Sequence, residues 1–420
     1  MGMTLAEKII AQKTGRSQVE PGEIVIAKVD CAMMDDILGP RVQIADELKR
    51  LNKSIWNPSK VVVISDHYFP AATVKQAEIV AFTRKWTQEY NIENYFEGIG
   101  PCHQILAEKG FCLPNSLLVG TDSHTCTAGA FGCFGTGIGS TEMLGVLITG
   151  EIWLRVPETI KINWEGNLSN GVMAKDVILK TIGDLGHAGA TYKVIEFCGS
   201  AVRSMPIDER MCLTNMAVEA GAKTGLIEAD KTVYEYLQAT GRANFDEPLR
   251  SDPDAIYCRE INYNASELVP QIACPHEVDN VKSVEEVSGL SLDQAYLGSC
   301  TGGRLNDLAV AANILKNRKV AFNCRLLVSP ASHDIWLKAA QTGILQTLAE
   351  AGAVILAPTC GACLGVHSGV IASGERCISS TNRNFTGRMG SREAEVYLAS
   401  PATVAASALE GRIADPRQYM

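Results

Sequence analysis

Short apolar runs rich in β-branched residues alternate along the chain with longer segments whose apolar positions follow a helical period. The strand-like runs occupy residues 60–65, 116–120, 193–197, 294–298 and 353–357. Helical patterning marks residues 1–15, 74–90 and 304–317. This alternation predicts an α/β architecture.

The length of the chain and its proline-containing breaks predict several domains. A chain of 420 residues is too long for one compact core. The pattern restarts after Pro157, and a polar region containing prolines covers residues 246–290. We therefore expect three α/β domains, with bounds at residues 1–157, 158–275 and 276–420.

Composition narrows the class of protein. The net charge of −9 argues against a nucleic-acid-binding surface, and Glu142 and Glu151 interrupt the longest apolar stretch, so we expect no membrane span. Fourteen cysteines without a secretory leader favour a reducing compartment, and we expect a cytoplasmic protein whose cysteines are thiols or metal ligands.

Chemically active side chains follow four of the predicted strands. They are Asp66 and His67; Asp122, Ser123 and His124; Cys300; and the pair Cys360 and Cys363. Ligands of open α/β sheets bind outside the carboxyl ends of strands. We therefore expect the four strand ends to converge on a single site.

The cysteine pair in "CGAC" fits a redox disulfide, half of a zinc site or part of an iron–sulfur cluster. Glycines beside Cys360 and Cys363 favour a backbone that bends around a bulky group. A zinc ribbon needs a second Cys-x-x-Cys, which the sequence lacks. With Cys300, three thiolates can bind three irons of a four-iron cluster and leave the fourth iron open. We expect the other eleven cysteines to be small buried hydrophobes.

Histidines and arginines supply the remaining candidates. His67 and His124 lie close to carboxylates in the sequence, and His103 lies in a glycine-bearing turn, a combination that favours acid–base chemistry. Arg383 and Arg388 flank "NFTG" and can clamp a carboxylate through bidentate hydrogen bonds. We expect the other four histidines to be structural, and "FGTGIGS" is a weak nucleotide-loop signal that no strand precedes.

The motifs "ISDH", "GTDSHT", "GSCTGGR", "CGACLG" and "NRNFTGRMG" together resemble the aconitase superfamily over essentially the whole chain. The chain is most similar in kind to the separate large subunits of two-subunit hydro-lyases. The resemblance implies three α/β domains around a central [4Fe-4S] cluster with three protein ligands, Cys300, Cys360 and Cys363, and one open iron.

The resemblance also assigns roles to individual residues. It implies three catalytic imidazole–carboxylate pairs: His67 with Asp66, His103 with Asp122, and His124 with Glu196. It implies that substrate contacts come from Ser123, Asn382, Arg383 and Arg388. Asp35 and Leu38 depart from the residues usual in relatives, and we expect Asp35 to touch substrate or its surroundings.

The implied activity is the dehydration and rehydration of a C3-alkylated malate, such as 3-isopropylmalate or 2,3-dimethylmalate. An alternative is a homoaconitase-type hydratase of homocitrate and cis-homoaconitate, a tricarboxylate substrate. A cluster-sensing RNA-binding protein and a zinc-structured scaffold are remoter alternatives, and the acidic charge disfavours the first. The swivel domain of single-chain relatives is absent, so we expect a small subunit to supply it in a heterodimer or heterotetramer. We expect the isolated chain to be inactive.

Overall fold

The computed structural model describes residues 2–242 and 244–420 and divides into two compact units. Unit 1 contains the N-terminal residues through Gly98, then Ile105–Trp164 and Ala190–Tyr263. Unit 2 contains Ile99–Gln104, Glu165–Gly189 and Asn264–Met420. Three larger sheets and one two-stranded ribbon are distributed over these units, and our division into three domains stays a prediction.

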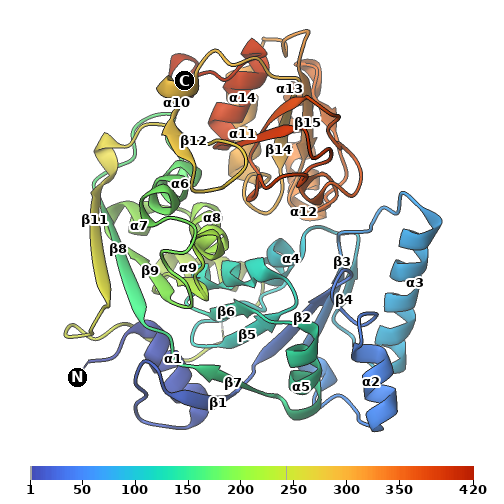
Figure 1. Ribbon diagram of the computed structural model, residues 1–420, viewed down its shortest axis with the longest axis vertical. Coiled ribbons are helices and arrows are strands. Elements are labelled where there is room, and N and C mark those ends of the chain that lie inside the picture. The colour runs from blue at the N-terminus through green and yellow to red at the C-terminus, as the bar shows by residue number, and fades with distance from the viewer. Residues whose placement is uncertain (1, 243) are drawn as a thin grey trace. The chain divides into compact units, whose positions relative to one another are not determined.

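The first sheet of unit 1 has five parallel strands in the order β4-β3-β2-β5-β6 (Figure 1). Their bounds are Tyr95–Glu97, Val61–Ser65, Cys31–Asp35, Leu117–Gly120 and Phe134–Gly137. Strands β2, β3 and β5 are buried along their whole length, as the apolar runs predict. The segment "FGTGIGS" begins with β6 itself, and β6 leads into helix α5 (Ser140–Thr149).

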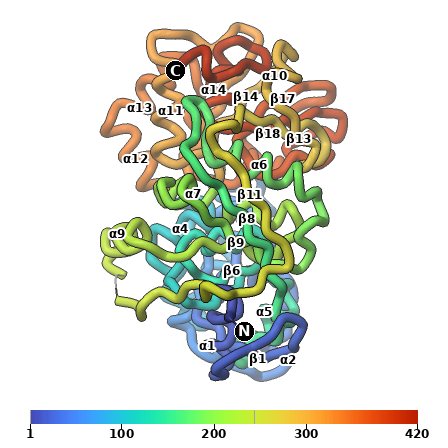
Figure 2. The backbone as a smooth tube through the Cα atoms, turned by 90° about the vertical axis from the view of Figure 1, so that its left-hand side faces the viewer, coloured from blue at the N-terminus to red at the C-terminus, as the bar shows by residue number. Residues whose placement is uncertain are grey.

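The second sheet of unit 1 has the order β10-β9-β8-β11, and Figure 2 shows β8 and β11 as neighbouring green and yellow strands. Their bounds are Thr224–Leu226, Val194–Cys198, Thr159–Glu165 and Arg259–Asn264. Strands β8, β9 and β10 are parallel. Their carboxyl ends therefore lie at one edge, where ligands of α/β sheets usually bind.

Helix α1 (Leu5–Thr14) begins at a capping box in which Thr4 and Glu7 satisfy each other's backbone amides. It ends at Gly15, whose φ of 68° a side chain would disfavour. Leu5, Ile9 and Ile10 are buried in the core of unit 1, as the helical period predicts. Strands β1 (Ile24–Lys28) and β7 (Glu151–Arg155) form a separate antiparallel ribbon.

Unit 2 is built on a seven-stranded sheet in the order β13-β12-β18-β17-β14-β15-β16. The bounds are Val281–Ser283, Gln271–Ala273, Glu395–Leu398, Arg376–Ser379, Gln294–Gly298, Arg325–Ser329 and Val354–Ile355. The last five strands in that order are parallel. Helices α11 (Leu305–Leu315) and α14 (Pro401–Glu410) contribute alanine-rich faces to the core that covers this sheet (Figure 1). Within residues 2–242 and 244–420, no helix is both long and apolar enough to cross a membrane.

One close backbone approach fixes the 3₁₀ helix η2 (Ser123–Phe131) against β10. A Cβ built on Gly129 would lie 1.7 Å from the carbonyl oxygen of Gly225. No side chain fits that gap, so a residue other than glycine must push η2 away from the sheet.

We therefore expect Gly129→Ala to lower the free energy of unfolding by about 2 kcal/mol or more, because it overpacks this contact. The matched control is Gly145→Ala in α5, where an added Cβ meets nothing within 4 Å. The control should stabilise by about 0.5–1 kcal/mol, because alanine is the better helix former. Urea denaturation followed by circular dichroism measures both, and equal midpoints for the two variants would contradict the packing argument.

Candidate active site

The loops that follow β2, β3 and β5 carry the acid–base residues of unit 1. The three strands are parallel neighbours, so their carboxyl ends lie at the same edge of the sheet. Asp36 follows β2, Asp66 and His67 follow β3, and Asp122 with His124 follows β5. Two of the four predicted strand ends, those after β3 and β5, therefore lie together in unit 1.

His67 is held by two buried carboxylates. Its Nδ1 lies 2.8 Å from Asp66 Oδ1 and 3.2 Å from Asp36 Oδ1. Asp36 also accepts hydrogen bonds from the backbone amides of His67 (3.1 Å) and Tyr68 (3.0 Å). The structure confirms that His67 pairs with Asp66, and it adds Asp36 as a second partner.

These carboxylates determine the charge of the ring. Burial lowers the pKa of His67, but the charge of Asp66 and the hydrogen bonds that the ring donates to Asp36 and Asp66 raise it well above its usual value. The raised pKa favours the charged imidazolium form, and this pairing occupies Nδ1 rather than Nε2. A positioned proton donor is what a poor leaving group requires.

Asp35 is tied to its own loop. Its Oδ1 accepts hydrogen bonds from the amides of Ile37 (2.6 Å) and Leu38 (2.8 Å), and its Oδ2 accepts one from the Thr121 hydroxyl (3.0 Å). Burial raises the pKa of Asp35 from 3.8 to about 6. The charge of His67 lowers this pKa in part, and the charge of Asp122 raises it further. The carboxylate shapes the loop between β2 and α2 (Ile44–Leu51), and its contact with substrate stays a prediction.

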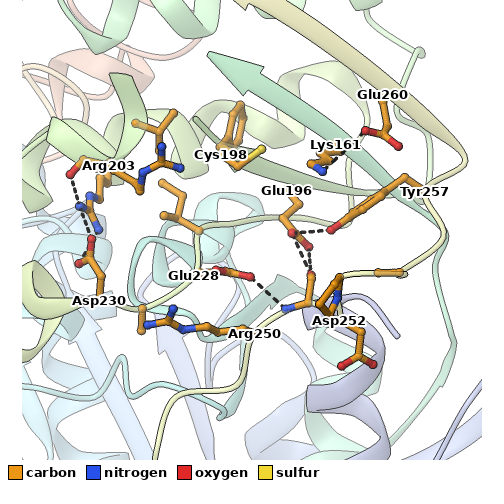
Figure 3. Close-up of a pocket in the computed structure, with 18 residues that line it drawn as sticks. Lys161, Glu196, Cys198, Arg203, Glu228, Asp230, Arg250, Asp252, Tyr257 and Glu260 are labelled. Atoms are coloured by element: carbon orange, nitrogen blue, oxygen red, sulfur yellow. Dashed lines mark hydrogen bonds and ion pairs between the residues drawn. The ribbon is translucent and has the colours of Figure 1, made fainter. Parts of the chain in front are cut away.

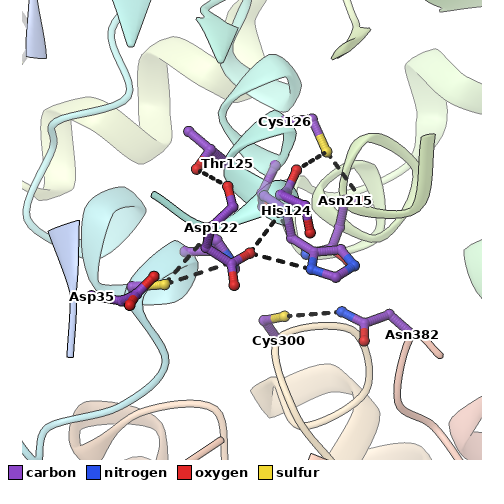
Figure 4. Close-up of polar contacts among 12 residues, drawn as sticks. Asp35, Asp122, His124, Thr125, Cys126, Asn215, Cys300 and Asn382 are labelled. Atoms are coloured by element: carbon purple, nitrogen blue, oxygen red, sulfur yellow. Dashed lines mark hydrogen bonds and ion pairs between the residues drawn. The ribbon is translucent and has the colours of Figure 1, made fainter. Parts of the chain in front are cut away.

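His124 lies between two carboxylates, and Figure 4 shows the contact with one of them, Asp122. Its Nδ1 is 3.3 Å from Asp122 Oδ1, and its Nε2 is 2.7 Å from Glu219 Oε1. Asp122 also caps η2 by accepting the backbone amide of His124 at 2.7 Å. Ser123 begins this 3₁₀ helix, which places it beside the pair.

The expected pairing of His124 with Glu196 is wrong. Glu196 lies in β9, and its carboxylate accepts hydrogen bonds from the hydroxyls of Ser251 (2.9 Å) and Tyr257 (3.0 Å). The carboxylate of Glu196 therefore faces Ser251 and Tyr257 rather than the ring of His124. Glu219, in the 3₁₀ helix η3 (Ala217–Ala220), takes the role that we assigned to Glu196.

Unit 2 holds the three candidate metal ligands. Cys300 follows β14, and Cys360 and Cys363 follow β16, and all three thiols are buried. Ser299 Oγ lies 3.7 Å from Cys300 Sγ and 3.6 Å from Cys363 Sγ. Two loops that are distant in sequence thus bring their sulfurs to a shared hydroxyl.

Asn382 bridges the same two thiols. Its Nδ2 donates to Cys300 Sγ at 3.9 Å (Figure 4), and its Oδ1 accepts from Cys363 Sγ at 3.7 Å. The buried Lys175 of α6 (Ala174–Leu185) donates to the carbonyls of Ser380 (3.0 Å) and Thr381 (2.8 Å), just before Asn382. An ammonium therefore positions this loop, and no sequence pattern had marked Lys175.

The two arginines of the loop differ in their surroundings. Arg388 Nη2 lies 3.9 Å from Cys363 Sγ, so its guanidinium reaches the thiols. The Arg383 guanidinium lies 6.0 Å from the ring centroid of Phe385. Arg388 is thus placed beside the candidate metal ligands, and the substrate roles of Arg383, Arg388, Asn382 and Ser123 stay predictions.

His103 lies at the start of α4 (Cys102–Glu108) and is buried. The neighbouring Gln104 accepts a hydrogen bond from Arg304 Nε at 2.9 Å, which ties this turn to the loop of Cys300. The pairing of His103 with Asp122 stays a prediction, because the two residues belong to different units. The convergence of all four strand ends on one site stays a prediction for the same reason.

His367 was expected to be structural, and the structure places it at the Cys360–Cys363 turn. A Cβ on Gly361 would lie 2.3 Å from its Cε1, so the ring packs directly on the backbone between the two cysteines. Its Nδ1 lies 2.8 Å from Ser368 Oγ. Its position four residues after Cys363 is the sequence feature that could have indicated a place beside the candidate metal ligands.

The donor set fits a multi-iron cluster better than a single ion. Among the described residues, the three thiols form no group whose sulfurs all lie within 4.8 Å of one another, the spacing expected for one shared ion. Cys300 and Cys363 share Ser299 and Asn382 as neighbours, and Cys360 precedes Cys363 by three residues in the same turn. In a multi-iron cluster each thiolate binds a separate iron, so the three sulfurs need not meet at one ion. Gly302 and Gly361 lie beside these cysteines at positions that leave no room for a side chain.

The remaining eleven cysteines are mostly buried, as expected. Burial raises the pKa of Cys324 and of Cys198 to about 11, which leaves both as unreactive thiols. Cys258 departs from the expectation, since it alone of the fourteen cysteines is exposed.

Comparison with known proteins gives a consistent result. A family model described as "Aconitase family (aconitate hydratase)" matches residues 7–289 and 282–411. The chain is similar to 3-isopropylmalate dehydratase large subunit 1 of Methanopyrus kandleri, with 50% identity over 423 residues that cover 100% of both chains. The corresponding large subunit 1 of Pyrococcus furiosus is 47% identical over 100% of this chain and 99% of its own.

A probable methanogen homoaconitase large subunit of Methanosarcina mazei is also 47% identical, over 94% of this chain and all of its own. Among solved structures, the holo-form of aconitase X from Thermococcus kodakaraensis matches with a TM-score of 0.52 and 11% identity. The match covers 88% of this chain and 89% of that one. This structural likeness supports the α/β fold alone.

The raised pKa of Asp35 predicts a pH-dependent stability. An acid whose folded pKa lies above its unfolded value stabilises the fold below the unfolded pKa, and that contribution is lost as the pH rises through about 6. Between pH 5 and 7.5, we expect Asp35 to remove about 1.5 kcal/mol from the free energy of unfolding. Asp35→Asn keeps an acceptor oxygen and should lack this loss. Urea titrations of both proteins at several pH values measure the difference, and parallel profiles would rule the effect out.

Proposed function

The chain belongs to the aconitase family of hydro-lyases, and on that premise we propose that it is the large subunit of a [4Fe-4S] enzyme acting on a C3-alkylated malate. The observation that carries the proposal is 50% identity over the whole chain to a protein named as a 3-isopropylmalate dehydratase large subunit. A 2,3-dimethylmalate substrate belongs to the same chemical class. The similarity to a probable homoaconitase large subunit supports a second candidate, which acts on a tricarboxylate.

Membership of the family implies a [4Fe-4S] cluster, and we propose Cys300, Cys360 and Cys363 as its three protein ligands. When bound, such a cluster supplies one iron without a protein ligand, a Lewis acid for the hydroxyl and a carboxylate of the substrate. Ser299 and Asn382 hold two of the sulfurs in place through their side chains. Arg388, whose guanidinium reaches Cys363, is placed to bind a substrate carboxylate beside them.

Elimination of water from a malate breaks a C–O bond on one carbon and a C–H bond on its neighbour. Hydroxide is a poor leaving group, so a proton must reach the oxygen as the C–O bond breaks. We propose that His67 provides this proton, because Asp66 and Asp36 keep its ring charged and oriented. His124, held through both ring nitrogens by Asp122 and Glu219, is proposed to orient the reacting groups.

The base that removes the C–H proton is proposed to come from a second chain. The similar proteins are named as large subunits, which implies a smaller partner. We propose that this small subunit carries the swivel domain with the proton-abstracting group and further substrate ligands. Rehydration at the neighbouring carbon then uses the same groups in reverse.

The cluster assignment predicts a spectroscopic loss. Anaerobic reconstitution of the wild-type chain with iron and sulfide should give visible iron–sulfur absorption and about four irons per chain. Cys300→Ser, Cys360→Ser and Cys363→Ser should each lose most of that absorption, because an iron loses its thiolate. Cys258→Ser is the matched control and should retain it, since Cys258 is exposed and lies just before β11, outside these loops. Full absorption in all three loop variants would remove the ligand assignment.

The subunit assignment predicts a dependence on the partner. We expect turnover of 3-isopropylmalate by the reconstituted pair and little or none by this chain alone. In the pair, His67→Asn should lower kcat by about 10²–10⁴-fold, because the charged proton donor is gone. A coupled assay of the alkene product by ultraviolet absorption measures both. Equal rates for the isolated chain and the pair would refute the proposed division of labour, and a preference for homocitrate would favour the second candidate.

A further inference from the structure

Unit 1 contains a cavity of about 340 Å³ that the proposed reaction does not use (Figure 3). It lies where β9 and β10 end, beside Cys198 and residues 227–230, and the segment 250–257 forms its opposite wall. The carboxyl ends of parallel strands are the usual ligand-binding edge of such sheets. The volume lies in the range of small-molecule sites.

Several charged residues of the wall are already neutralised within the protein. Arg210 is fully buried and donates two hydrogen bonds to Asp230, at 2.8 and 2.7 Å. Lys161 lies 3.6 Å from Glu260 and 4.9 Å from the ring centroid of Tyr257. These groups shape the cavity without needing a ligand.

Two cations and two carboxylates of the wall remain available. Arg203 and Arg250 are exposed, and within the described part of the chain neither forms an ion pair. Glu228 accepts one hydrogen bond, from the Ser251 amide at 3.0 Å. Glu196 is only 3% exposed and accepts hydrogen bonds from two hydroxyls but from no cation of the described residues.

The arrangement favours a ligand that carries both charges. In the view of Figure 3, the carboxylates of Glu196 and Glu228 lie between Lys161 and the arginine side chains. A dicarboxylate would meet repulsion from the two glutamates, and a diamine would meet repulsion from Arg203 and Arg250. Phe197, Val202 and Ile227 add apolar wall beside these charges.

We propose that this cavity binds a small zwitterion, an α-amino acid with an aliphatic side chain. Its carboxylate pairs with Arg203 and Arg250, its ammonium group with Glu228 and Glu196, and its side chain packs on the apolar wall. The site is formed by unit 1 alone and does not depend on the proposed reaction. It also gives a role to Glu196, whose carboxylate does not pair with His124.

A ligand ammonium group would act against the raised pKa of Glu196. Burial raises the pKa of Glu196, the hydroxyls of Ser251 and Tyr257 lower it, and the charge of Glu228 raises it again. A ligand ammonium group would stabilise both carboxylates in their charged form.

The test uses L-norleucine and two analogues that each lack one charge, hexanoate without the ammonium group and pentylamine without the carboxylate. Isothermal titration calorimetry with the full chain should give a dissociation constant of about 1 mM for norleucine. Each analogue should bind about tenfold more weakly or worse, because one charge-assisted contact is lost. Equal binding of norleucine and either analogue, or no heat from norleucine, would overturn the proposal.

Variants separate the site from non-specific charge effects. Arg250→Gln and Glu228→Gln should each weaken norleucine binding about tenfold, and the amide oxygen introduced by Glu228→Gln still accepts from the Ser251 backbone. The matched control is Arg259→Gln, an exposed arginine of β11 outside the cavity lining, which should bind as the wild type does. Circular dichroism checks the fold of each variant, and the analogue series decides alone if a variant does not fold. Wild-type affinity in both cavity variants would overturn the proposal.

Discussion

The neutralisation of buried imidazoles by carboxylates is the constraint on which the arrangement of unit 1 depends. A charged ring taken out of water costs several kcal/mol unless an opposite charge and hydrogen bonds replace its hydration. Asp36 meets this need for His67 and, through two backbone amides, also fixes the loop that carries the ring. Asp122 likewise fixes the backbone of His124 by accepting its amide, while it contacts the ring and caps η2. The carboxylates beside each imidazole therefore also fix its position.

The thiols of unit 2 are positioned in a different way. A thiol is a weak hydrogen-bonding group, so its burial costs little free energy. Their convergence comes from backbone geometry and from shared polar neighbours. Gly302 and Gly361 allow loops to pack without side chains, against Ser380 and His367 respectively. Lys175 holds the carbonyls that precede Asn382, so a buried ammonium group supports the residue that bridges two sulfurs. The positions of the thiols are therefore determined by these neighbouring groups.

Much of the fold and part of the site follow from the sequence. Periodicity located β3, β5, β9, β14 and the helices α1, α3 (Val74–Glu89) and α11, because burial of one face controls which residues are apolar. Motif spacing singled out the three cysteines, whose role as ligands stays a prediction, and the pair Asp66–His67, whose side chains are in contact and which is local in sequence. Glu219 was missed, since it lies 95 residues from His124 in a short 3₁₀ helix whose pattern signals nothing. Glu196 was mispaired because sequence alone does not reveal which face of β9 a carboxylate takes.

The single exposed thiol has a practical consequence for biophysical work. A maleimide dye reacts with thiolates that solvent reaches, so under native conditions it should attach at Cys258 before the thirteen less accessible cysteines. The chain therefore offers a natural attachment point for a fluorophore, next to the edge strand β11 of the second sheet of unit 1. Slower labelling of the buried cysteines would require local unfolding, so the rate of dye incorporation would also measure how often the protein opens locally.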